Sequence, residues 1–333
     1  MKKQLLLSLI FSFFCGIIFG QHLIRVNNNA AADADYLTLQ EANDNAIAGD
    51  TIYVEGSTAN YNDAVTFDKQ LTIIGPGYFL TENDSTQANG LEAYINPTIT
   101  FGPGSAGSSI TGIAGSTIHI DANNISITRC RVSYIDIYTS GTVENILISQ
   151  NYVSYIGSSS GFCINSIISN NIISTNISFQ SNSNGPLQIL NNIIWGGTYS
   201  YPINVYNSTI SNNIICTTLG KIAVNTGNTI TNNIMFASGT NENGNIYGIA
   251  MTSVFVDYSG SLNYSDDAKW KLKTGSPALG AGVAGVDCGA FGGPTPYVLS
   301  GIPALPHIYE ATIPGVAYTG TGLSCTLKVK AGK

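Results

Sequence analysis

Charged side chains are scarce in this chain of 333 residues, since Asp, Glu, Lys and Arg together make up 10% of it. Between Asn145 and Thr240 the one charged residue is Lys221. Basic residues number 13 against 20 acidic ones, so the clustered Lys and Arg that bind nucleic-acid phosphates are not expected. An acidic polysaccharide would also be repelled unless a local basic patch or a cation intervened. Hydrophobic residues reach 44%, which is enough for a long core and argues against disorder.

Long apolar runs are absent after the N-terminus, which itself reads as a secretory signal over residues 1–20. Lys2 and Lys3 precede the apolar run Leu5–Ile18, and Gly20 supplies a small residue before Gln21. The run is too short to favour a permanent membrane span. We therefore expect a secreted or cell-surface protein with no transmembrane segment in the mature chain. Loss of the two lysines changes the formal net charge from −7 to about −9.

Paired cysteine motifs are absent as well. After the signal an odd number of cysteines remains, without a CxxC pair, at Cys130, Cys163, Cys216, Cys288 and Cys325. Neither a disulfide framework nor a zinc site is indicated, and no metal ligands are assigned. The first three are interpreted as small apolar residues of a stacked core.

What the chain does have is a repeat. Units such as Ser169-Asn170-Asn171-Ile172-Ile173 recur with steps of 20, 21, 21 and 20 residues. The second Asn of each unit stands at Asn151, Asn171, Asn192, Asn213 and Asn233. A period of this size is typical of a solenoid, in which each unit buries its apolar face only against its neighbours. The leucine-rich pattern is absent, and short β-branched runs between Asn, Gly, Ser and Thr predict strands and turns.

The repeated Asn has a physical rationale. The chain must bend sharply between two strands of a coil, often through the left-handed region that Asn tolerates. The side-chain amide can donate to the Asn one coil away, so five in register predict an internal ladder of hydrogen bonds.

With this repeat the sequence resembles the secreted bacterial right-handed parallel β-helix proteins of the pectate-lyase-like superfamily. Tyr36–Ala48 reads as an amphipathic helix with a Thr38/Glu41 capping box and Gly49 as its stop, which in this family covers the N-terminal end. Residues 276–280 and 287–293 resemble the closing segment of such proteins. The resemblance implies an all-β, single-stranded right-handed parallel β-helix over residues 21–296, with a small β extension over 297–333. Between about residues 65 and 264 there is room for roughly nine or ten coils, a rod of about 45 Å.

Candidate catalytic residues gather just before the charge-poor stretch: Arg129, Arg131, Asp121 and Asp136. Arg131 should point outward, because the next position of the repeat stays apolar. β-helix lyases use a base such as Lys or Arg, with a cation or Arg to neutralise the uronate carboxylate. A surface cluster of ion pairs would give the same pattern and is the favoured interpretation. The motifs of the polygalacturonase, pectin-methylesterase and calcium-dependent lyase types are not matched.

Aromatic residues suggest a different role. Tyr134 and Tyr155 are 21 residues apart and should stack on adjacent coils, and Tyr138 and Trp195 add further rings. Tyrosine can pack flat against a sugar while its hydroxyl bonds outward, although ordinary packing would also explain each ring. Asp84-Ser85-Thr86 fits a bacterial O-glycosylation site, a tripeptide that also occurs by chance.

Three functions follow from the sequence. The leading hypothesis is an exported non-catalytic solenoid that binds extracellular polysaccharide or a cell-surface glycan, or serves in surface adhesion. The alternative is a polysaccharide lyase or glycoside hydrolase that acts on an acidic polysaccharide. No cofactor is expected, apart from calcium if the protein is a lyase. A purely structural rod is the third hypothesis, because one fold can support many activities.

Overall fold

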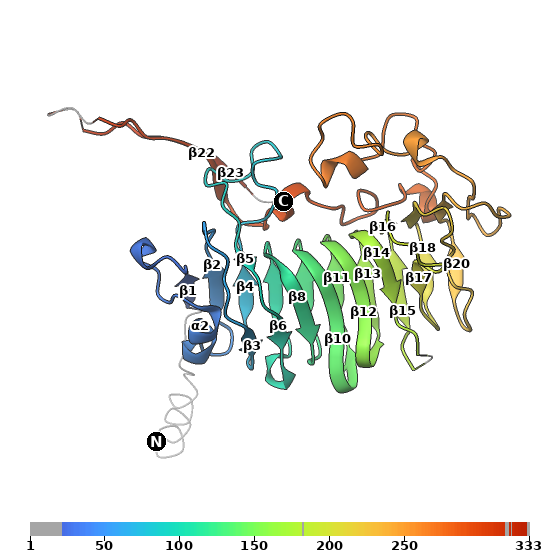
Figure 1. Cartoon of the computed structure of the whole chain (residues 1–333), viewed down its shortest axis with the longest axis horizontal. Helices are drawn as coiled ribbons and strands as arrows, with labels where there is room; N and C mark the ends of the chain where they lie inside the picture. The colour runs from blue at the N-terminus through green and yellow to red at the C-terminus, as the bar shows by residue number, and fades with distance from the viewer. Residues whose placement is uncertain (1–21, 182, 317–319, 321, 332–333) are drawn as a thin grey trace, which may run out of the picture.

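A computed structural model describes residues 22–181, 183–316, 320 and 322–331. The predicted signal, residues 1–20, lies outside the described residues. The described chain winds into about nine turns of a parallel β-solenoid, with its strands stacked side by side along one axis (Figure 1). The predicted fold class is confirmed. No helix in this part of the chain is long and apolar enough to cross a membrane.

Two long parallel sheets follow the axis. Sheet A contains, in spatial order, β1 (Leu23–Val26), β2 (Thr51–Val54), β4 (Thr72–Ile74), β7 (Ser109–Thr111), β9 (Ser126–Thr128), β11 (Leu147–Ser149), β13 (Ser166–Ser169), β15 (Leu187–Leu190), β18 (Thr209–Ser211) and β20 (Thr229–Thr231). Sheet B contains β3 (Val65–Phe67), β6 (Ile99–Phe101), β8 (Ala114–Ile120), β10 (Arg131–Glu144), β12 (Tyr152–Ile164), β14 (Ile172–Ser178), β16 (Ile193–Ile194), β19 (Ile214–Ile215) and β21 (Ile234–Met235). Two short strands join it at its sides, β5 (Tyr94–Ile95) on β8 and β17 (Ile203–Asn204) on β14.

The central residue of each strand in sheet A points into the rod. From β2 to β20 this residue is isoleucine in every strand, at Ile52, Ile73, Ile110, Ile127, Ile148, Ile168, Ile189, Ile210 and Ile230. All but Ile230 are at most 2% exposed. Burial of each such side chain contributes about 1.5–3 kcal/mol. The period of about 20 residues therefore stacks isoleucine on isoleucine from coil to coil in a continuous core.

Sheet B bends along each coil and so has two halves. The register of β12 against β14 shifts between Val153 and Tyr155, and two separate strands, β16 and β17, pair with the one strand β14. We call the part before the bend the covered half, residues 114–115, 131–132, 152–153, 172–173, 193–194, 214–215 and 234–235. The part after the bend is the open half, residues 117–120, 134–137, 155–157, 176–178 and 203–204.

The predicted asparagine ladder is present at the corner between sheet A and the covered half. Each ladder amide donates from Nδ2 to Oδ1 of the next Asn at 2.9–3.0 Å, and the same Oδ1 accepts the preceding ladder residue's backbone N–H. Cys130 begins the row through its backbone N–H, and Asn245 extends it beyond Asn233. Asn151, Asn171, Asn192, Asn213 and Asn233 are each 0% exposed. The ladder thus satisfies amides whose burial would otherwise be costly.

The left-handed conformation belongs to the residue before each ladder Asn, which corrects the expectation that the ladder residue makes the bend. The residues with positive φ are Arg129, Gln150, Asn170, Asn191, Asn212 and Asn232, at 53–62°. We call these six the corner row. The corner residue turns the chain, and the ladder Asn that follows it satisfies the hydrogen bonds of the buried amides.

The corner row also binds the C-terminal part of the chain. Residues 250–303, here called the return segment, contain short 3-10 turns such as η3 (Met251–Ser253) and η4 (Ala268–Trp270) and run back along the rod (Figure 1). Corner side chains bond its backbone one coil at a time: Asn232 to Ala281, Asn212 to Val283, Asn191 to Asp287, Asn170 to Ala290 and Gly292, Gln150 to Thr295 and Pro296, and Arg129 to Ile302. We call this series of hydrogen bonds between the corner row and the return segment the zipper. The predicted closing segment, residues 276–280 and 287–293, lies within it.

The return segment seals the covered half under a second hydrophobic core. Outward isoleucines of sheet B, including Ile193 and Ile214, pack with Phe255, Trp270 and other return-segment residues. The backbones approach so closely that a Cβ added to Gly289 would lie 2.6 Å from Cδ1 of Ile214. Only a glycine fits at this position, where φ is also +84°.

A buried carboxylate fastens the far end of the return segment. Asp267 is 0% exposed and accepts hydrogen bonds from Asn83 Nδ2 at 2.9 Å and Ser265 Oγ at 2.8 Å. Its second oxygen accepts the backbone N–H of Ser300 at 2.7 Å and the hydroxyl of Tyr297 at 3.3 Å. The carboxylate therefore ties the loop around residue 83 to the far end of the return segment, around residue 300.

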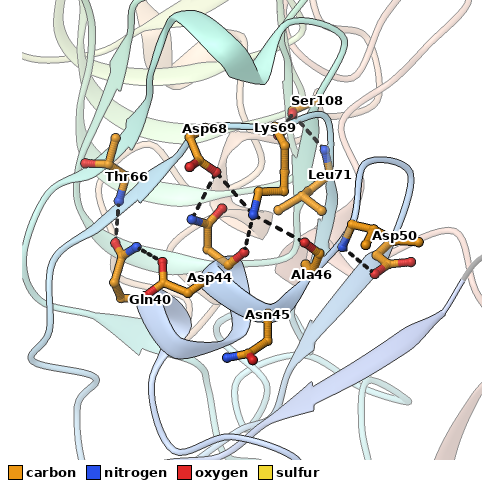
Figure 2. Close-up of polar contacts among 12 residues, drawn as sticks. Gln40, Asp44, Asn45, Ala46, Asp50, Thr66, Asp68, Lys69, Leu71 and Ser108 are labelled. Atoms are coloured by element: carbon orange, nitrogen blue, oxygen red, sulfur yellow. Dashed lines mark hydrogen bonds and ion pairs between the residues drawn. The ribbon is translucent and has the colours of Figure 1, made fainter.

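The N-terminal cap agrees with the prediction, although its helix is shorter. Helix α2 (Leu39–Asn45) has the Thr38/Glu41 capping box and packs against β3. Figure 2 shows Lys69 at the C-terminal end of this helix, where Nζ donates to the carbonyls of Asn43 at 2.7 Å and Ala46 at 3.2 Å. A cation at this end satisfies free carbonyls and is attracted by the negative end of the helix dipole.

The described residues end in an antiparallel hairpin, β22 (His307–Thr312) with β23 (Thr326–Lys330). Its strands are largely exposed, and its base bonds the rod through the Ala88 N–H and the Ile308 carbonyl. Cys130, Cys163 and Cys216 are buried free thiols, as predicted.

The ladder predicts a large loss of stability when a middle amide is removed. The side chain of Asn192 makes five hydrogen bonds, so Asn192→Ala should lower the free energy of unfolding by about 3 kcal/mol or more, because its buried partners lose theirs. Urea titration followed by circular dichroism measures the change. Asn60→Ala, at an exposed site, should stay within about 0.5 kcal/mol. Equal losses in the two variants would contradict the ladder's role.

The zipper predicts local opening without global unfolding. Asn170→Gly keeps a residue suited to φ 55° but removes the bonds to Ala290 and Gly292 at 3.0 and 2.7 Å. Hydrogen exchange should rise about tenfold across residues 286–296, while the ladder amides stay protected. The control Asn243→Gly, at an exposed residue with φ 49°, should change neither region. Unchanged exchange over 286–296 in Asn170→Gly would show that the corner bonds do not hold the segment.

Candidate functional site

The open half of sheet B brings polar side chains from successive coils into two rows, in which Asp136, Asn176 and Ser178 are at most 6% exposed. The first row is Thr117, Tyr134, Tyr155 and Asn176, and the second is His119, Asp136, Gly157 and Ser178. Between them the inward residues Ile118, Ile135, Ile156 and Ile177 are each 0% exposed. The alternation of strand side chains therefore holds both rows on a rigid base.

Aromatic rings cover the centre of this surface. Tyr134 and Tyr155 are register partners on adjacent coils, as the spacing of 21 residues predicts, but their rings, with centroids 5.9 Å apart, are tilted by 56° and not stacked. Tyr138 stacks on His119 at 4.5 Å with an interplanar angle of 15°. Tyr134 and Tyr138 remain 51% and 54% exposed, so their faces are accessible to a ligand.

Asp136 lies between these rings and is 5% exposed. Burial raises the pKa of its carboxyl group above the ordinary value of 3.8, while hydrogen bonds from Ser159 and the nearby His119 oppose the shift. The pKa of the Tyr155 hydroxyl is also raised, first by burial and then by the charge of Asp136. Asp136 and Tyr155 are therefore electrostatically coupled, an arrangement found at many functional sites.

Gly157 makes room for the Tyr155 side chain. A Cβ added to Gly157 would lie 2.1 Å from the Tyr155 hydroxyl oxygen, so any larger residue would displace the ring. The hydroxyl reaches towards the carbonyl of Ser178 at 3.4 Å. Beside the rows, a pocket of about 320 Å³ is lined by Ser158–Gly161, Gln180, Ser181 and Asn184. Hydroxyl and amide groups thus continue the surface past the tyrosines.

The four proposed catalytic residues occupy separate surroundings rather than one groove. Arg129 belongs to the corner row, where Nε donates to Gln150 at 2.9 Å and burial lowers its pKa. Arg131 points outward on the covered half, forms an ion pair with Glu92 and lies 4.9 Å from the ring centroid of Phe79. Asp121 follows the end of β8, and Asp136 alone of the four lies on the open half.

Trp195 also lies apart from the three tyrosines. Its ring stacks on Trp270 of the return segment at 5.3 Å, and Lys269 Nζ lies 5.7 Å from its centroid. It is part of the second core and does not line the open half. This contact could not be predicted from the repeat, because the covering residue is 75 positions away.

Sequence reasoning did not single out Asn176, Gly157 and Ser178. A signal was available, since Tyr134, Tyr155 and Asn176 are separated by steps of 21 residues, as are Asp136, Gly157 and Ser178. Extension of the ladder period to every outward position would have found both rows. Within the described residues, no group of three His, Cys, Asp or Glu side chains is arranged to hold a metal ion.

The strand order and the stacked corners settle the architecture. The chain is a right-handed parallel β-helix. No protein-family model matches its sequence, and no curated protein does. Among solved structures this β-helix is similar to that of pectate lyase Pel9A, at 13% sequence identity and a TM-score of 0.40, over 82% of this chain and 97% of that one.

The raised pKa of Asp136 predicts how stability depends on pH. A carboxyl whose folded pKa lies above its unfolded value takes up a proton more readily in the folded state, so stability falls as pH rises through that interval. Asp136→Asn should therefore be more stable than the unmodified chain at pH 7, and the difference should shrink as pH falls towards 3.8. Urea midpoints across this range measure it. The exposed Asp63→Asn should show no such trend, and a constant difference for Asp136→Asn would refute the assignment.

Proposed function

We propose that this β-helix is an exported, non-catalytic protein that binds an extracellular carbohydrate along the open half of sheet B. The observation that supports it is the group of rings Tyr134, Tyr138 and Tyr155 on one rigid surface, of which Tyr134 and Tyr138 are more than half exposed and Tyr155 is partly buried. Tyrosine faces pack against the apolar faces of sugar rings, while neighbouring polar groups bond the sugar hydroxyls. Export is supported by the signal in residues 1–20.

The charge of the chain favours a neutral glycan. The formal net charge is −7, and the open half carries Asp136 between its aromatic residues. Neither Arg129 nor Arg131 faces this surface, because the first holds the return segment and the second pairs with Glu92. A uronate polymer would therefore meet a carboxylate without a facing guanidinium, which disfavours its binding.

Asp136 supports a second candidate, a polysaccharide lyase or glycoside hydrolase. Its pKa is raised by burial and it is the register partner of His119, so its carboxyl group is the candidate proton donor or acceptor on this surface. In this candidate Asp136 is the acid or base, and the two arginines take no part. Formation of reducing ends or of unsaturated products from any glycan, lost in Asp136→Asn, would favour it over simple binding.

The binding proposal predicts a loss of affinity when the rings are removed. The protein from Gln21 onward is run in native gels that contain neutral or acidic polysaccharides, and retardation reports binding. Tyr134→Ala with Tyr155→Ala should weaken binding of a neutral glycan by about 10- to 100-fold, because each ring contact contributes about 0.5–1.5 kcal/mol beyond its burial. Tyr264→Ala removes a ring that is 48% exposed on the return segment and should have no effect. Equal retardation of all three proteins would contradict the proposed site.

A further inference from the structure

The antiparallel hairpin of β22 and β23 has an apolar face and a polar face. The apolar face consists of residues that are register partners across the two strands, Ile308 with Val329 and Ala311 with Leu327. Lys328 and Lys330 alternate with Leu327 and Val329 along β23, so they lie on the opposite face. There Lys328 forms an ion pair with Glu310 at 2.7 Å. The hairpin thus separates its apolar side chains from its charges, as a strand pair does when one face is to be covered.

The apolar face of the hairpin is largely uncovered. Ile308, Leu327 and Val329 are 40%, 53% and 61% exposed, and within the described residues no third strand joins the hairpin. A two-stranded hairpin is marginally stable in water unless its apolar face packs against another element. Contiguous exposed apolar side chains are also typical of interaction surfaces. This face is therefore expected to be covered by another molecule.

The hairpin belongs to the N-terminal end of the rod, although it comes last in the chain. A groove of about 420 Å³ separates its base from the early strands of sheet A, with Ile308 and Ala311 on one side and Tyr53 and Ile74 on the other. From this base the hairpin projects past β1, beyond the end of the rod (Figure 1). A second molecule that met the N-terminal end of the rod would therefore meet the hairpin as well.

The same end of the rod carries a second exposed apolar group, here called the cap patch. It consists of Leu23 in β1 with Leu37 and Ile47, which precede and follow α2. These three side chains are 56%, 46% and 48% exposed, and α2 contacts β1. The cap patch thus offers apolar side chains at the end towards which the hairpin projects.

The cap and the hairpin are complementary in charge. Residues 21–69 contain eight acidic and two basic residues, which gives this part of the chain a formal charge of −6. Residues 304–333 contain three lysines and one glutamate, which gives a formal charge of +2. The 234 residues between them are also acidic, with 11 carboxylates against six basic residues. The hairpin is therefore the basic part of an acidic protein, and its attraction is strongest for the most acidic part.

These properties favour a second copy of the chain as the partner. Within one molecule the hairpin projects away from the rod, so its apolar face leaves the cap patch uncovered (Figure 1). Two molecules that meet at their N-terminal ends can cover both surfaces at once, because a two-fold axis brings each hairpin to the cap of the other molecule. We propose that the chain forms a closed end-to-end dimer in which each hairpin packs its apolar face on the cap patch of the other copy.

The test measures the mass of the particle in solution, with the protein from Gln21 onward. Sedimentation equilibrium over a range of concentrations should show monomer and dimer. Leu327→Glu with Val329→Glu places carboxylates against the acidic cap of the other copy and should raise the dissociation constant of the dimer about tenfold or more. Leu23→Lys with Ile47→Lys places ammonium groups against the basic hairpin and should have the same effect. Circular dichroism and urea midpoints establish that the rod of each variant is folded.

A mixture of the two double variants distinguishes the proposed contact from a general loss of structure. In the mixture the unmodified hairpin of one variant meets the unmodified cap of the other. At the second contact the new glutamates meet the new lysines, so opposite charges face each other. The mixture should therefore dimerise at a concentration at which neither variant does so alone.

A matched control removes exposed apolar side chains elsewhere on the rod. Leu219→Glu with Val224→Glu, at residues that are 74% and 89% exposed in the later coils, should leave dimerisation unchanged. A monomer at every concentration would overturn the proposal, and so would a mixture that stays monomeric. Loss in the hairpin variant alone would show that two hairpins pair with each other, and particles that grow steadily with concentration would show an open head-to-tail chain, so either result would also overturn it.

The dimer proposal does not rest on the carbohydrate proposal. All the substitutions lie outside the open half of sheet B, so retardation in glycan gels should be the same for dimerising and monomeric variants. Failure to dimerise therefore leaves the carbohydrate proposal to its own experiment.

Discussion

The structure depends on two adjacent residues at one corner of each coil. The first adopts a left-handed conformation that turns the chain, and the second places its amide between the amides of the coils before and after it. Each ladder amide is fully buried and would be costly if its partners moved, so the coils are held at one spacing and in one register. The in-register isoleucine columns follow from this constraint, since a shift of one residue would turn them towards solvent.

The first residue of each pair also binds the return segment, because its side chain faces away from the ladder. Four consecutive asparagines bind the return segment, and the row continues through Gln150 and Arg129, whose longer side chains reach the carbonyls of Pro296 and Ile302 at 2.7 Å. The return segment then buries the outward isoleucines of sheet B. Half of that sheet is sealed in this way, and the half beyond the bend remains available to a ligand.

The sequence allowed the local part of this architecture to be predicted. The period, the ladder at Asn151 to Asn233, the capping box and the pairing of Tyr134 with Tyr155 all depend on residues within about one coil of each other. The zipper could not be predicted, because Asn170 bonds a residue 120 positions away and the partner groups are backbone carbonyls or N–H groups, which carry no sequence signal. For the same reason Arg129 and Trp195 could be placed on the surface of the repeat but not under the return segment, and Arg131 could not be placed against Glu92 and Phe79.

The scarcity of charge has a physical cause in this packing. Residues at equivalent positions of neighbouring coils lie about 4.8 Å apart, so a repeated charged position would stack like charges along the whole rod. At such a distance each repulsion amounts to about 1 kcal/mol even in water. The charges that do occur in the coils are not repeated: Asp136 has His119 and Gly157 as its register partners, and Arg131 pairs with Glu92 beside the loop around residue 83. The regular faces are left with hydroxyl, amide, methyl and aromatic groups, so recognition there must depend mainly on shape, stacking and neutral hydrogen bonds.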